Sequence, residues 1–206
     1  MKYMPERRLF CELGRRMWEK GWVAANDGNL SMRVESGQLL VTPSRVSKGF
    51  MTPDMILLLD ASGEPLDPGS PWVPSSELLL HLRCYELRGE INGVCHAHPP
   101  YATAFACARL PIDVPILGET LMSLGPIPCA PYARTGTQAL ALAAAPLLAK
   151  YNGVLLANHG AVTLGGGLEE AYLRMETLEH TAQIHLNTRL LGGGVPLTSE
   201  EAAELR

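Results

Sequence analysis

Residues 93–100 read GVCHAHPP, and this stretch predicts a short strand over residues 93–98 that ends at two prolines. Side chains two residues apart leave the same face of a strand, so His96 and His98 are expected side by side. Two imidazoles at that spacing can chelate one metal ion. Cys95 points to the opposite face, which makes it a poor candidate for a further ligand.

A third histidine, His159, follows another apolar stretch that predicts a strand over residues 154–157. Residues at strand ends are common in functional sites, because the sheet holds them rigidly while the loop leaves them accessible. A single histidine at a strand end is nevertheless more often a hydrogen-bonding residue than a metal ligand. The sequence alone does not place His159 beside His96 and His98.

Three neutral imidazoles would leave at least one open position on a metal ion. That ligand count is typical of a catalytic site rather than a closed structural one. The ligand type favours Zn²⁺, with Mn²⁺, Fe²⁺ and Co²⁺ as alternatives. The other histidines, His81, His180 and His185, are interpreted as packing or surface residues.

Glu77 follows two serines, Ser75 and Ser76, in the first turn of a predicted helix. An acidic residue in a first turn can simply complement the helix dipole. The same helix start offers free backbone N–H groups and two hydroxyls, which favour an anion such as phosphate. A carboxylate beside a phosphate is unfavourable unless a cation or a proton exchange compensates the repulsion. The repulsion between the two anions therefore favours a catalytic role for Glu77.

Short apolar segments separated by glycine and proline turns fill the rest of the chain. Hydrophobic spacing predicts helices over residues 7–20, 101–108, 138–150 and 168–191, and one that opens at 74–77 and closes at 89. It predicts strands over 30–34, 38–42, 55–60, 93–98, 154–157 and 161–164, the first two as a hairpin, and extended pieces over 112–116 and 127–130. This mixture favours an α+β or mixed α/β fold in a single domain over residues 1–206.

Composition and charge argue against several function classes. The net charge is −4, with acidic and basic residues mixed along the 206 residues, so no nucleic-acid partner is expected. No apolar run is long enough to span a bilayer, and the N-terminus lacks the apolar core of a signal peptide. The 5 cysteines lack close pairing and indicate free thiols in a reducing compartment. We therefore expect a cytoplasmic protein without a membrane partner.

Short motifs along the chain occur in an order that resembles one known family. They are DGNLS at 27–31, VTPS at 41–44, SSE at 75–77, HAH at 96–98, IPCAPY at 127–132 and NHG at 158–160. Together they resemble the class II aldolase/adducin family, and within it the L-fuculose-1-phosphate aldolase-like proteins. The match covers essentially the whole chain, and the ordered set is far more specific than any single motif.

The resemblance implies a three-layer α/β/α fold around a mostly antiparallel sheet. It implies a zinc ion on His96, His98 and His159, with Glu77 as a ligand at rest and as the proton carrier in turnover. Arg45 stands where the family has glycine, and its charge could strengthen binding of an anionic substrate or reshape the pocket. Family members are typically homotetramers with active sites at subunit interfaces. The phosphate pocket that the resemblance implies consists of Gly28, Asn29, Ser44, Ser75 and Ser76.

The implied activity is that of a lyase. The enzyme would cleave a ketose phosphate, such as L-fuculose 1-phosphate, to dihydroxyacetone phosphate and an aldehyde, through an enediolate that the metal stabilises. The tyrosines that handle the aldehyde in the family have no counterpart here, neither in residues 116–120 nor after the last long helix. A metal-dependent sugar-phosphate dehydratase, decarboxylase or 4-epimerase therefore stays open, as does a non-catalytic adducin-like interaction module.

Overall fold

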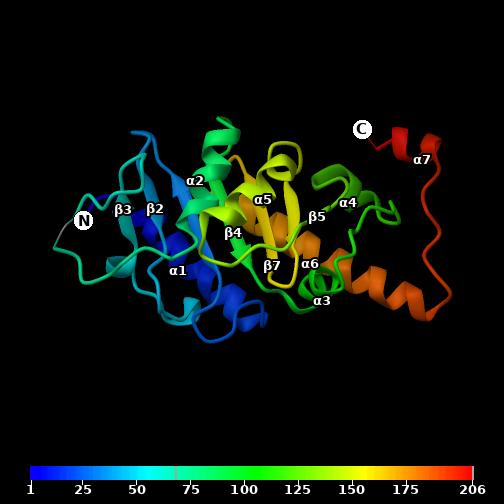
Figure 1. The fold of residues 1–206 in the computed structure, drawn as a ribbon, viewed down its shortest axis with the longest axis horizontal. Helices are drawn as coiled ribbons and strands as arrows, with labels where there is room; N and C mark the ends of the chain where they lie inside the picture. The colour runs from blue at the N-terminus through cyan, green and yellow to red at the C-terminus, as the bar shows by residue number, and fades with distance from the viewer. Residues whose placement is uncertain (68, 206) are drawn as a thin grey trace.

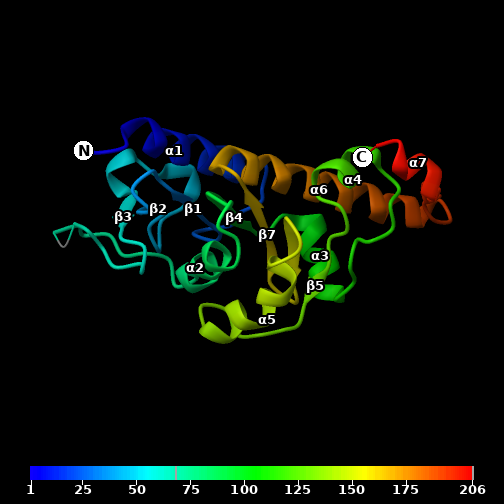
Figure 2. The ribbon, with the colours of Figure 1, turned by 90° about the horizontal axis from the view of Figure 1, so that it is seen from above.

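The computed structural model describes residues 1–67 and 69–205, which contain a seven-stranded sheet with helices on both faces (Figures 1 and 2). The strand order is β3-β2-β1-β4-β7-β6-β5. All neighbouring strands are antiparallel except β5 and β6. The strands are β1 (Asn29–Arg33), β2 (Leu39–Val41), β3 (Leu57–Leu59), β4 (Gly93–Ala97), β5 (Cys129–Ala130), β6 (Gly153–Leu156) and β7 (Gly160–Gly165). The expected mixed α/β fold with a mostly antiparallel sheet is confirmed.

The helices form the two outer layers, with α1, α3 and α6 on one face of the sheet and α2 and α5 on the other (Figure 2). None of the helices in the described part of the chain is both long and apolar enough to cross a membrane. Their bounds are α1 (Met4–Glu19), α2 (Leu78–Leu87), α3 (Pro100–Ala108), α4 (Gly118–Ser123), α5 (Gln138–Leu148), α6 (Leu168–Leu190) and α7 (Ser199–Ala203), with 3-10 turns at Lys48–Phe50 and Pro53–Met55.

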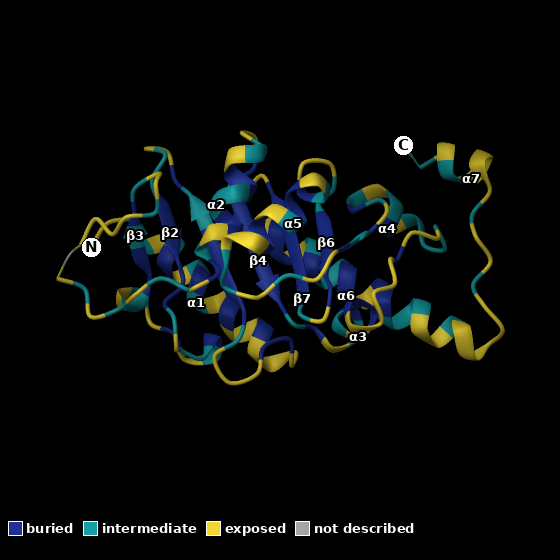
Figure 3. Cartoon of the chain, viewed as in Figure 1, coloured by how far each residue is buried: buried dark blue, intermediate teal, exposed yellow. Residues whose placement is uncertain are grey.

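The central strand β4 is buried on both faces, because each face packs against one helical layer (Figure 3). Cys95 and Ala97 belong to the core under α1 and α6, whereas Val94 belongs to the core under α2 and α5. His96 has the parity of Val94 and so leaves the strand on the α2 side. Burial raises the pKa of the Cys95 thiol to about 12, which keeps it protonated and unsuited to metal binding at neutral pH.

Several local expectations about secondary structure are wrong. Pro100 begins α3 instead of preceding it, because the first turn of a helix needs no backbone donor there. The strand expected over 55–60 shortens to β3, since the chain before it forms a 3-10 turn. The piece expected over 112–116 contributes only a bridge from Ile112 to Ile127. The short helices α4 and α7 were not expected.

Candidate metal centre and active site

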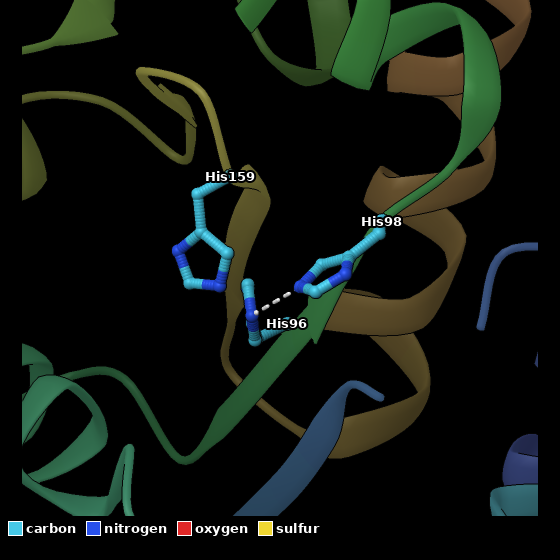
Figure 4. Close-up of side chains that lie close together, drawn as sticks. All are labelled: His96, His98 and His159. Carbon is cyan, nitrogen blue, oxygen red and sulfur yellow. Dashed lines mark hydrogen bonds between the residues drawn. The ribbon is translucent and has the colours of Figure 1, made fainter. Parts of the chain in front are cut away.

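Three imidazole rings converge where the central strand β4 ends (Figure 4). His96 belongs to β4, His98 follows it, and His159 lies in the turn between β6 and β7. The ring nitrogens that could bind a metal, one from each residue, lie within 4.8 Å of one another. His96 Nε2 and His98 Nε2 are 3.2 Å apart. The two histidines that strand spacing pairs thus face the same point in space.

The register between β4 and β7 brings His159 to this point. The two strands are antiparallel with Ala97 opposite Ala161, so the end of β4 lies beside the turn that starts β7. Asn158 has a left-handed backbone conformation in this turn, with φ 56°. Gly160 allows the turn to approach β4, because a Cβ there would lie 2.5 Å from the Ala97 carbonyl oxygen. A residue without a side chain is therefore required directly after His159.

Glu77 reaches the same point from α2. Its Oε2 lies 2.9 Å from His96 Nε2, and its Oε1 lies 3.2 Å from His159 Nε2. Glu77 is the N-cap residue of α2 and not part of its first turn, and its side chain makes no capping hydrogen bond. Burial by itself would raise the pKa of this carboxyl group. The two imidazoles and the Asn29 amide outweigh burial and hold the pKa well below its usual range.

The chemistry of this donor set fits a bound cation. The Ala161 carbonyl oxygen, which can only accept, lies 2.9 Å from His96 Nδ1, so Nδ1 carries a proton. Burial opposes a charge on His96, but the Glu77 carboxylate beside Nε2 outweighs burial and raises the pKa of this ring, so a proton or a metal ion on Nε2 is favoured. Burial, followed by charge on His96, lowers the pKa of His98 and His159 to about 4. Both rings are therefore neutral at pH 7, which is the form that binds metal.

A cavity of about 260 Å³ opens over this cluster, and Glu77, His98 and His159 lie in its wall. A single substrate in this cavity could contact both the candidate metal ligands and the groups expected to bind phosphate. Gly28 has φ 69°, and a Cβ there would lie 2.9 Å from the His96 carbonyl oxygen, so this turn favours glycine. The residues that the sequence assigns to substrate or phosphate binding all line the cavity: Gly28, Asn29, Ser44, Arg45, Ser75 and Ser76.

Two charged residues of the cavity were not among the expected site residues. Asp27 Oδ2 lies 3.5 Å from His98 Nδ1, and its place in the DGNLS motif was a usable signal. Lys48 also lines the cavity, but it belongs to no motif and only the fold brings it there. His180 is exposed on α6, and His185 lines a different cavity, so neither joins the cluster.

A buried chain of hydrogen bonds holds Asn29 against Glu77. Asn29 Nδ2 donates to Glu77 Oε2 at 3.0 Å, so Asn29 Oδ1 accepts from His81 Nε2 at 2.5 Å. His81 Nδ1 then accepts from Ser31 Oγ at 2.6 Å, and Tyr85 donates to the same Oγ at 2.7 Å. Burial lowers the pKa of His81 to about 3, which keeps the ring neutral with one N–H. His81, which the sequence assigned to packing or to the surface, thus has a defined hydrogen bond on each ring nitrogen.

We expect the substitution His81→Phe to lower kcat by about 10–100-fold, the usual cost of disturbing a residue that orients metal ligands. The phenyl ring fills most of the imidazole space but breaks both hydrogen bonds, so the Asn29 amide is free to turn away from Glu77. Steady-state kinetics and metal analysis of the purified variant measure the effect. Tyr85→Phe removes only the far end of the chain and should cost less. Wild-type kinetics in His81→Phe would contradict the positioning role.

Residues 8–186 match the family model described as Class II Aldolase and Adducin N-terminal domain. The chain belongs to this family. A 3-oxo-tetronate 4-phosphate decarboxylase from Escherichia coli (strain K12) is 33% identical over 207 residues, which cover 97% of this chain and 94% of the relative. A 5-deoxy-D-ribulose 1-phosphate aldolase from Bacillus thuringiensis is 32% identical over 207 residues, covering 100% of this chain and 95% of the relative.

Solved structures of the class II aldolase family share the fold. The structure of an L-fuculose 1-phosphate aldolase superposes with a TM-score of 0.91 at 29% identity, and the match covers 100% of this chain and 96% of that one. Class II aldolases are metal-dependent, and the histidine triad could hold the metal in this member. The decarboxylase and aldolase relatives support a lyase, and their substrates are phosphorylated sugars or sugar acids. The resemblance stated from the motifs is confirmed.

Proposed function

We propose that this class II aldolase family member is a divalent-metal-dependent lyase of phosphorylated sugars or sugar acids. It would break the bond between the α and β carbons of a ketone. The observation that carries the proposal is the convergence of three imidazoles and the Glu77 carboxylate in a cavity lined by anion-binding groups. We propose Zn²⁺, because nitrogen ligands with an open position are its usual catalytic set.

His96, His98 and His159 would hold the metal, with Glu77 as a further ligand at rest. A divalent cation there acts as a Lewis acid that stabilises negative charge on substrate oxygens when the carbon–carbon bond breaks. The free N–H groups at the start of α2 and the cation of Arg45 would hold the phosphate of the substrate. Further phosphate contacts would come from Gly28, Asn29, Ser44, Ser75 and Ser76, which line the same cavity.

Glu77 would carry the proton of the reaction. Cleavage of a ketose 1-phosphate and of a 3-oxo-tetronate 4-phosphate both leave the enediolate of dihydroxyacetone phosphate. This enediolate becomes the ketone product when one carbon gains a proton. Glu77 lies in the cavity wall beside two imidazoles. Its carboxylate is ionised at rest, so it would take a proton from solvent and deliver that proton to the carbon. General acid catalysis of this kind contributes about 10²–10⁴-fold to a rate.

The two candidate reactions differ in the group that leaves the substrate. Retro-aldol cleavage releases an aldehyde and needs a second base that takes the hydroxyl proton of the departing carbon. Loss of CO₂ from a 3-oxo acid needs no such base. The segment where the family's tyrosine is missing is residues 116–120, and three of its residues, Ile116, Leu117 and Thr120, line a different cavity. This observation favours decarboxylation over aldol cleavage.

A panel of phosphorylated substrates tests the proposed function. We expect release of dihydroxyacetone phosphate and an equal amount of CO₂ from 3-oxo-tetronate 4-phosphate, and slower release from ketose 1-phosphates. A chelator should abolish the activity and added Zn²⁺ should restore it. Release of an aldehyde from a ketose 1-phosphate as the faster reaction would instead establish an aldolase. No product from either class, in protein that purifies without a divalent ion, would overturn the proposal.

The homotetramer with active sites at subunit interfaces and the cytoplasmic location stay predictions. Apolar side chains that are exposed on the α2 and α5 layer support self-association, since exposed apolar groups often mark an interface. Leu79 is 46% exposed and Leu142 is 55% exposed. Sedimentation of the purified protein tests the homotetramer.

A further inference from the structure

Lys48 carries its ammonium group into the protein instead of into solvent. The side chain is 1% exposed, and it begins the 3-10 turn Lys48–Phe50. Its Nζ donates to the carbonyl oxygens of Asn26 at 2.9 Å and of Val46 at 2.7 Å. An ammonium group has three N–H donors, so the two carbonyls leave one for another partner.

The charge of Lys48 has no carboxylate partner in its immediate surroundings. Within the described ranges 1–67 and 69–205, no acidic oxygen lies within 4.0 Å of Nζ. Burial lowers the pKa of Lys48 to about 8, and the more distant Asp27 only partly opposes this effect. A buried cation without an anion is costly to maintain. Such a group is common where a ligand supplies the missing negative charge.

The location of Lys48 indicates which ligand that is. Lys48 lies in the wall of the same 260 Å³ cavity as Arg45, Ser75 and Ser76. Two cationic residues and the serines before α2 therefore line one cavity, and the combination suits a doubly charged anion better than a neutral sugar. The candidate metal ligands lie in the same wall. An anion bound beside Lys48 would thus belong to a molecule that also reaches the metal centre.

We propose that Lys48 is a specificity-determining residue, whose ammonium binds the phosphate group of the substrate and selects phosphorylated over unphosphorylated sugars. The identity of the substrate rests on the proposed function. The binding of phosphate by Lys48 does not depend on it. The competing explanation is structural, because Lys48 also joins the loop at Asn26 to the loop at Val46. A structural role would affect all ligands of the cavity alike.

Titration calorimetry with inorganic phosphate tests this proposal on the metal-loaded protein. We expect Lys48→Met to weaken phosphate binding by about 10- to 100-fold, the range for a hydrogen bond to a charged group. Lys48→Arg keeps the charge and should retain most of the affinity. Lys150→Met is the matched control, since Lys150 is exposed at the end of α5 and should bind phosphate like the wild type.

The pH dependence of phosphate binding provides a second test. The ammonium of Lys48 is charged below its pKa of about 8, so phosphate affinity of the wild type should fall as the pH rises from about 7 to about 9. The other charged groups of the cavity are Asp27, Arg45, Glu77, His98 and His159. Inorganic phosphate also loses its second proton near the start of this range, so Lys48→Met is measured over the same range. The difference between the two profiles isolates Lys48, and the variant should lack the decline.

The outcomes separate this proposal from the proposed function. Equal loss of affinity for a phosphorylated sugar and its unphosphorylated form in Lys48→Met would establish the structural role and overturn the proposal. Wild-type phosphate affinity in Lys48→Met, or the same pH dependence in Lys48→Met as in the wild type, would overturn it as well. If phosphate binding depends on Lys48 but no sugar phosphate is cleaved, the anion site stands and only the proposed lyase reaction fails.

Discussion

Replacing Glu77 by glutamine should lower kcat by about 10²–10⁴-fold, the contribution typical of a general acid or base. Glutamine keeps the size of the side chain and one oxygen near His96 and His159, but it cannot carry a proton. We therefore expect the variant to keep its fold and its metal. Glu77 Oε2 lies 2.9 Å from His96 Nε2, and the amide oxygen of glutamine can take the same position. Steady-state kinetics, far-ultraviolet circular dichroism and metal analysis of the same preparation measure the three properties.

Solvent isotope exchange separates the proton-transfer role of Glu77 from a role in substrate binding. The wild type should exchange a carbon-bound hydrogen of dihydroxyacetone phosphate with D₂O, because formation of the enediolate removes that proton. Glu77→Gln should bind the product and exchange nothing. Glu35→Gln is the control, since Glu35 is exposed and lies after β1, away from the cavity. Full activity or exchange in Glu77→Gln would remove Glu77 from the mechanism.

Replacing His96 by alanine should reduce the bound divalent metal from about one ion per chain to almost none. His96 is 0% exposed, and the hydrogen bond from its Nδ1 to Ala161 holds its ring in place. Its loss would remove the buried ring that Glu77 Oε2 faces at 2.9 Å. His98, His159 and the Glu77 carboxylate would remain, and we expect these three donors to bind the ion much more weakly without the ring that orients Glu77. Elemental analysis of protein dialysed against metal-free buffer measures the occupancy, and activity should fall with it.

Two further variants show whether loss of metal in His96→Ala results from a lost ligand or from misfolding. His180→Ala removes an exposed histidine from α6 and should leave metal and activity at the wild-type level. His159→Ala removes a proposed ligand that lies in a turn, with less disturbance to the sheet, and should also lose metal. If His96→Ala and His159→Ala both keep a full complement of metal and a native circular dichroism spectrum, the assigned ligands are wrong.

The local pattern of the sequence predicted most of the sheet, because strand and helix periodicity depends only on near neighbours in the chain. The hairpin of β1 and β2 follows from two apolar runs about one glycine turn. The elements that were missed or wrong, such as α4 and the piece over 112–116, are short. For short segments the packing against distant residues outweighs local propensity.

The sequence by itself determined that His96 and His98 face one point, since the two-residue period of a strand is a property of the backbone. The tertiary structure decided that His159 and Glu77 join them, through the pairing of Ala97 with Ala161 and the position of α2. The motif resemblance had anticipated that grouping. Nothing in the sequence indicated Lys48 at the cavity, because contacts between residues far apart in the chain form only when the layers pack together.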